Sequence, residues 1–98
     1  MTAVPNFLTG RKSIIGTAAL QLTTNTTKAD RGVQVTAAAG NSATIYVGLH
    51  NVTADSADDT DGFPLAAGES ILVPVRDATK VYVVASSGTS SKVFFMLV

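Results

Sequence analysis

The chain has 98 residues, of which 46% are hydrophobic and 14% charged, with seven basic and seven acidic side chains. This length predicts a single domain, and the zero net charge excludes a strongly basic nucleic-acid-binding surface and a polybasic membrane anchor. The absence of cysteine from the sequence excludes disulfides, thiolate metal sites and a cysteine nucleophile. Thirteen threonines and twelve valines against a single glutamate favour β-strands over helices.

Residues 1–10 are predicted to form an N-terminal arm, followed by one β-sandwich domain over residues 11–98. Pro5 and Gly10 interrupt regular structure, and the apolar Phe7 and Leu8 follow no period. Exposed on a free arm, these two side chains would be in water. We therefore expect the arm to pack on its own domain or on a neighbouring subunit.

Residues 13–22 follow the basic pair Arg11 and Lys12 and are largely apolar, which superficially resembles a signal peptide. The basic pair lies ten residues into the chain, and Gln21 and several threonines interrupt the apolar run. We interpret the segment as a first strand or strand pair, broken near Gly16, followed by a polar loop over residues 23–30.

Residues 32–37 and 44–49 alternate between apolar and other side chains, the period of half-buried strands. The expected inward residues are Val33, Val35 and Ala37 in the first strand and Ile45, Val47 and Leu49 in the second. A short turn over residues 38–42 separates them, so we predict a β-hairpin.

The second half of the sequence predicts a long polar loop and three further strands. The loop covers residues 52–62, and the strands cover residues 70–76, 80–85 and 92–98. Pro74 has no amide hydrogen, which predicts an edge strand or a bulge. About seven short strands without a convincing helix predict an antiparallel β-sandwich or a small barrel, Greek-key or jelly-roll-like, and of the two we expect the sandwich.

Apolar residues also occupy the nominally outward positions of the last strands, where a solvated sheet face should be polar. One explanation is a deep sandwich in which the register is misassigned. The other, which we favour, is a second face covered by another subunit or by the arm. The candidate interface residues are Pro5, Phe7, Leu8, Leu72, Tyr82, Val84, Phe94 and Met96.

No arrangement of residues in the sequence predicts catalysis, a metal ion or a cofactor. His50 is the single histidine, and no nucleophile motif accompanies it. The acidic loop, with Asp55, Asp58, Asp59 and Asp61, could offer oxygen ligands to Ca²⁺, but it does not fit the EF-hand spacing and is expected to be solvated. The glycines are isolated and form no phosphate-binding loop. We therefore expect a non-enzymatic protein without a cofactor.

Two segments carry a family resemblance: RGVQVTAAAGNSATIYVG and GFPLAAGESILVPVRDATKVYVVAS. They resemble small all-β proteins and modules encoded among the virion genes of tailed bacteriophages, and the most distinctive parts are IYVG and GFPLAAGES. The resemblance covers about two-thirds of the chain. It implies a structural virion component, either a capsid decoration (cement) protein or a tail or fibre module, and it implies no catalytic residues.

The expected function is therefore that of a capsid decoration protein, which binds and stabilises the outer surface of an icosahedral phage head. Its expected partners are the major capsid protein or another virion protein, and further copies of itself, most naturally as a trimer. It would be made in the host cytoplasm and reside in the virion, with no nucleic acid or membrane as partner. The alternatives are a tail or fibre component, and a carbohydrate- or cell-surface-binding module that uses Tyr46 and Tyr82.

Overall fold

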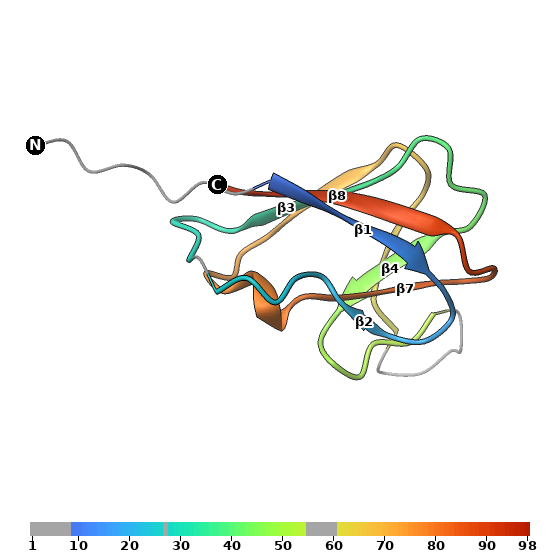
Figure 1. Cartoon of the computed structure of the whole chain (residues 1–98), viewed down its shortest axis with the longest axis horizontal. Coiled ribbons are helices and arrows are strands. Elements are labelled where there is room, and N and C mark those ends of the chain that lie inside the picture. Colours follow the sequence, from blue (N-terminus) through green and yellow to red (C-terminus); the bar gives the residue numbers. More distant parts are fainter. Residues whose placement is uncertain (1–8, 27, 55–60) are drawn as a thin grey trace, which may run out of the picture.

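Two four-stranded antiparallel sheets pack together in the computed structural model, which describes residues 9–26, 28–54 and 61–98 (Figure 1). A single 3₁₀ turn, η1, accompanies the strands. The elements are β1 (Thr9–Ile15), β2 (Leu20–Gln21), β3 (Val33–Ala37), β4 (Ile45–Gly48), β5 (Phe63–Leu65), β6 (Ser70–Val73), η1 (Ala78–Lys80), β7 (Tyr82–Ala85) and β8 (Ser91–Leu97). No helix in these ranges has the length and apolarity needed to cross a membrane. The predicted all-β sandwich is confirmed.

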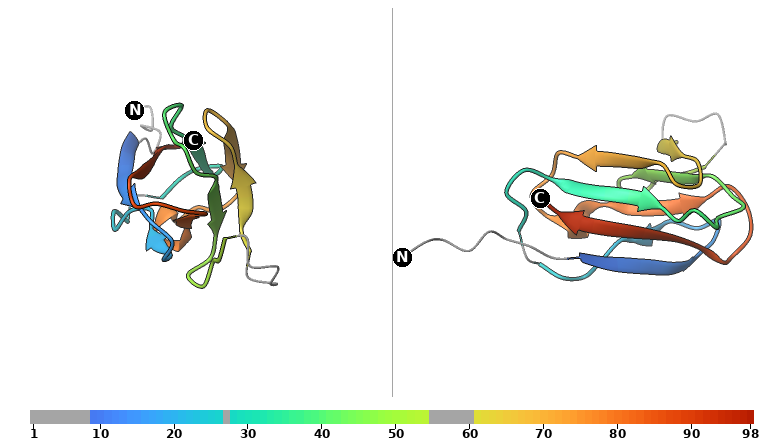
Figure 2. Two further views of the ribbon diagram at one scale, coloured as in Figure 1. Left: turned by 90° about the vertical axis from the view of Figure 1, so that its right-hand side faces the viewer. Right: turned by 90° about the horizontal axis from the view of Figure 1, so that it is seen from above.

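The strand order identifies the sandwich as a jelly roll. The first sheet has the order β1-β8-β3-β6 and the second β2-β7-β4-β5. Figure 2 (right) shows the first sheet side by side, from blue β1 through red β8 and teal β3 to β6. The chain crosses between the sheets at every connection except the one from β4 to β5.

The predicted hairpin of residues 32–37 and 44–49 is wrong. β3 pairs with β6 and β8, whereas β4 lies in the other sheet and pairs with β5 and β7. Both strands have one apolar side, and residues 38–44 carry the chain from one layer to the other. In the observed sandwich, the apolar sides of β3 and β4 face each other across the core. In a hairpin the two strands would instead lie next to each other in one sheet.

The inward positions of both sheets form one core of small aliphatic side chains. The expected inward residues of β3, and Ile45 and Val47 of β4, are all buried in it. Among the described residues, Phe95 of β8 contributes the one aromatic ring of this core. This ring lies against Gly10 of β1, where an added Cβ would stand 2.5 Å from the ring atom Cζ. Gly10 is therefore needed for the close approach of the ring to the strand.

Strand β1 begins at Thr9, two residues before the expected boundary between arm and domain. It pairs with β8 from Thr9↔Met96 to Lys12↔Val93, and the register then shifts before Ile15↔Ser91. This bulge inserts one extra residue, so Ile15 turns into the core. Ile14 has a φ of 59° within it, a left-handed conformation that β-branched residues rarely adopt.

Candidate functional site

The outer face of the first sheet carries three of the candidate interface residues. Cross-strand pairing places Thr9, Met96, Gln34 and Leu72 in one row, and Arg11, Phe94, Thr36 and Ser70 in the next. Phe94 is 47% exposed and Leu72 is 52% exposed, whereas Met96 is half-buried. Polar and apolar side chains alternate along the first row, and Phe94 is the only apolar member of the second, so the face is not a continuous apolar surface.

Tyr82 and Val84 lie on the other sheet, so the predicted second face is not one surface. Val83 and Ala85 of β7 point into the core, which leaves Tyr82 and Val84 on the outer side of the second sheet. Val84 is only 1% exposed and lies opposite Tyr46 of β4. Its assignment to an interface is wrong, because this chain already covers it.

A different apolar surface gathers where the edge strands β5 and β6 border the gap between the two sheets. We call it the apolar side and define it by Leu49, Phe63, Leu72, Pro74 and Val75. These residues line one groove of about 200 Å³, with the edge of the core as its floor. Leu49 and Phe63 are 65% and 57% exposed. Three of the five large hydrophobic side chains that are exposed in the described residues therefore meet in one place.

The opposite gap, between the edge strands β1 and β2, is polar. We call it the polar side and define it by Lys12, Gln21, Thr23, Thr24 and Asn25, which line a groove of about 390 Å³. Lys12 pairs with the inward-facing Val93, so this lysine extends from an inward position of the edge strand. An inward-pointing charge of this kind discourages another chain from adding to the sheet.

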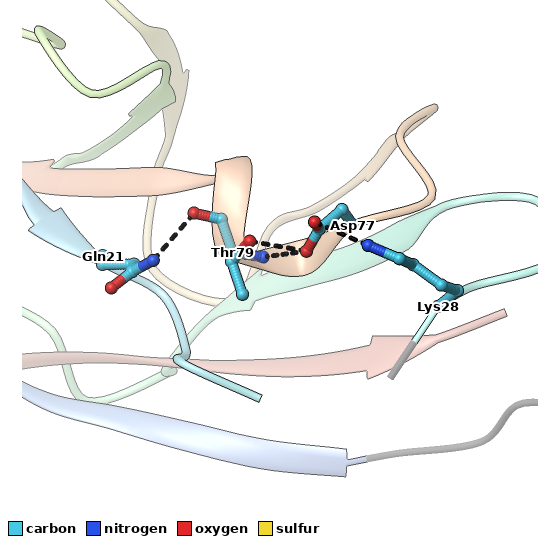
Figure 3. Close-up of polar contacts among 4 residues, drawn as sticks. All are labelled: Gln21, Lys28, Asp77 and Thr79. Carbon is cyan, nitrogen blue, oxygen red and sulfur yellow. Dashed lines mark hydrogen bonds and ion pairs between the residues drawn. The ribbon is translucent and has the colours of Figure 1, made fainter. Parts of the chain in front are cut away.

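An ion pair joins the chain leaving β2 to the chain leaving β6 (Figure 3). Lys28 Nζ donates to Asp77 Oδ2 at 2.8 Å, and the Thr79 amide and hydroxyl donate to Asp77 Oδ1 at 3.0 and 2.6 Å. The Lys28 and Thr79 hydrogen bonds hold the pKa of Asp77 well below its ordinary value. Gln21 Nε2 donates to the Thr79 carbonyl at 3.0 Å, which extends the contact to β2. The cluster caps η1 and links it to the segment around β2, and this structural role accounts for its hydrogen bonds.

The described part of the acidic loop is engaged in local hydrogen bonding. Thr53 Oγ1 donates to Asp61 Oδ1 at 2.7 Å, and the two residues form an isolated parallel bridge. Asp61 is half-buried, which differs from the expected solvated position, while Asp55, Asp58 and Asp59 lie outside the described residues. Within the described ranges, no three His, Cys, Asp or Glu residues stand close enough to hold a metal ion.

His50 is exposed at the end of β4, beside a shallow groove that Tyr82 and Lys80 also line. None of the other residues lining this groove is a serine or an acidic residue. Tyr46 and Tyr82, the two aromatic residues considered for sugar binding, are both half-buried on the outer face of the second sheet.

Sequence reasoning missed Leu49 and Phe63. Leu49 continues the alternation of Ile45 and Val47, so it was expected in the core, but β4 ends at Gly48 and the chain turns away from the sheet. Phe63 directly precedes Pro64 in an edge strand of three residues. The strand-breaking residues Gly48 and Pro64 were the available signals. The remaining candidates, Pro5, Phe7 and Leu8, lie outside the described residues.

A comparison with protein-family models, curated proteins and solved structures finds no match to this chain. The argument for a function therefore rests on the surfaces described above and on the sequence motifs.

Proposed function

We propose that this protein is a structural virion component, a capsid decoration protein that binds the outer surface of an icosahedral phage head and stabilises it. One observation carries the proposal: exposed large apolar side chains of a small jelly roll gather at one side, around Leu49, Phe63 and Leu72. Such a surface is typical of a domain that binds other proteins. The motifs shared with phage virion modules support the same role.

A protein can reinforce a capsid by binding alone, without catalysing a reaction. A protein shell is weakest at the contacts between its subunits, and a rigid domain that spans such a contact adds buried area there. The sandwich has a core closed from both sheets, which suits a rigid bridge.

The proposal is tested by fractionating virions of the phage that encodes the chain. Particles are separated into heads and tails, and an antibody against the protein is used on each fraction. We expect the protein in the heads, and we expect isolated heads stripped of it to rupture at a lower temperature than heads to which it has been restored. Protein found only in tails would instead establish the tail or fibre role.

A matched variant links the result to the apolar side. The substitution Phe63→Ser changes an exposed side chain and should leave the fold intact, while binding to stripped heads weakens tenfold or more. Ile14→Ser is the control, because Ile14 is 75% exposed and lies outside the apolar side. Equal losses for both variants, or a protein absent from both virion fractions, would refute the proposal.

A further inference from the structure

The groove on the apolar side is built to receive side chains and not an added strand. It runs between the edge strands β5 and β6. Pro64 occupies the middle of β5 and Pro74 directly follows β6, and neither residue has an amide hydrogen to offer a new strand. A partner at this place therefore gains affinity from apolar contact in the groove.

The size of the groove suits one aromatic ring. Its volume is about 200 Å³, and an apolar cavity of roughly 150 Å³ is enough to bind benzene. Its lining is almost wholly apolar, with Lys80 as the one charged residue among the described residues that border it. The fitting occupant is an uncharged, extended segment with an aromatic anchor.

The sequence contains such a segment immediately before β1. Residues 4–8 read Val-Pro-Asn-Phe-Leu, and residues 1–10 contain no charged side chain. Pro5 restricts its own backbone and favours an extended conformation in the residue before it, which lowers the entropy lost on docking. Phe7 supplies the aromatic anchor, and Leu8 supplies a second apolar contact.

The groove of the same molecule is out of reach for Leu8, and Phe7 could touch at most its near wall at Leu72. Thr9 and Leu72 occupy the same cross-strand row, with β8 and β3 between them, so three strand spacings of about 4.8 Å separate them, or roughly 14 Å. The Cα of Phe7 can lie no more than about 7 Å from that of Thr9, and the Cα of Leu8 about 3.8 Å. Leu8 cannot enter its own groove even if the chain turns straight across the sheet.

We propose that residues 4–8 of one copy dock in the apolar-side groove of a second copy, with the Phe7 ring inserted between Leu49, Phe63 and Leu72. The two surfaces of this contact are different, so the association is head-to-tail and continues from copy to copy until it closes into a ring. A ring of three copies is the expected closed form. The exchange is measured without capsids, so its failure would leave the virion role standing. Because the arm would occupy the groove proposed to bind heads, a loss of head binding in Phe63→Ser would include any loss of the ring.

The first test measures wild type and three variants of the full chain by sedimentation velocity at micromolar concentration. Two of the variants carry two substitutions each, and the control carries one. The arm variant is Phe7→Ser with Leu8→Ser, and the groove variant is Leu49→Ser with Leu72→Ser. Phe94→Ser is the control, because Phe94 is as exposed as Leu72 but lies outside the groove. We expect wild type and control to form oligomers, and the dissociation constants of the other two to rise roughly a hundredfold or more.

The decisive test mixes the arm variant with the groove variant. Each alone should be monomeric, but the intact arm of the groove variant can enter the intact groove of the arm variant. One contact of this kind forms per pair, so the mixture should give a 1:1 complex of twice the 10.0 kDa chain mass and nothing larger. Circular dichroism melting of each variant verifies that the domains are folded.

Four outcomes would overturn the exchange. The first is a wild type that is monomeric throughout the micromolar range. The second is a mixture of the two variants that stays monomeric. An oligomer that survives the arm substitutions but not the groove substitutions would mean that two grooves pack face to face. Dissociation caused by Phe94→Ser alone would place the contact on the outer face of the first sheet.

Discussion

The sandwich has two open sides, and they differ in the residues that border them: one is polar and the other apolar. Each is a gap between the edge strands of the two sheets, where core side chains approach water. On the polar side, Lys12 and the polar residues around Gln21 cover the gap. On the apolar side, the gap is bordered by Leu49, Phe63 and Leu72. This difference is the basis of our proposal that a protein partner covers the second gap, whereas polar side chains already face solvent at the first.

The largest expected effect comes from replacing one phenylalanine near each of the two sides. Phe95 is buried against Gly10 near the polar side, whereas Phe63 projects from the apolar side. Phe95→Ala should lower the free energy of unfolding by about 3–5 kcal/mol, because it opens a cavity in the core. Phe63→Ala should cost less than about 1 kcal/mol. Urea denaturation of both variants measures the difference, and equal losses would contradict the assignment of inner and outer positions.

The contact between Gly10 and the Phe95 ring, near the polar side, predicts a smaller change in the free energy of unfolding. Gly10→Ala would place a methyl group against the Phe95 ring, and either the ring or the strand must shift. We expect the free energy of unfolding to fall by about 1–3 kcal/mol, the usual range for overpacking. Gly40→Ala is the matched control, because no atom lies within 4 Å of a Cβ built there. A Gly10 variant as stable as this control would show that the ring does not need the space.

The bulge of β1 predicts a gain in stability. Ile14 combines a positive φ with a largely exposed side chain, so its conformation is strained and its burial contributes little. Ile14→Asn should raise the free energy of unfolding by up to about 1 kcal/mol, since asparagine tolerates this conformation. Ile14→Val keeps the branched Cβ and should give no gain. If thermal unfolding shows the same midpoint for both variants, the bulge carries no strain.

The ion pair between the chains that leave β2 and β6 predicts the smallest effect. Because the pKa of folded Asp77 lies below its unfolded value, the unfolded chain binds a proton more readily in acid. The stabilisation is therefore complete above about pH 5 and declines as the pH falls through the unfolded pKa of about 3.9. Asp77→Asn should lower the melting temperature slightly at pH 7. The difference from wild type should shrink toward pH 3, and a constant difference would refute the linkage.

The strand pattern was sufficient for the composition of the core, because alternation directly reports which side of a strand is apolar. Val33, Val35, Ile45 and Val47 were expected inside and lie there. Pro74 likewise predicted an edge strand or a bulge, and β6, which ends directly before Pro74, is an edge strand. Both inferences depend only on neighbouring residues.

The arrangement of strands in the two sheets could not be predicted in the same way. Alternation in β3 and β4 is equally compatible with one hairpin and with two facing layers, since either buries the same residues. The apolar side was missed for a related reason. Whether Leu49 faces the core depends on the end of β4 at Gly48, where the chain leaves the sheet and the period no longer applies.

The strand order also has a consequence for how the chain acquires its structure during synthesis. β8 lies between β1 and β3, and β7 lies between β2 and β4, so each sheet is completed by a strand from the C-terminal part of the sequence. Only the pair of β4 and β5 joins consecutive strands. Chains dominated by such distant pairings fold slowly, over milliseconds to seconds. During synthesis, β1 therefore has no partner and β3 has only β6 until β8 has been made. Strand edges that stay unpaired in this interval are an aggregation hazard.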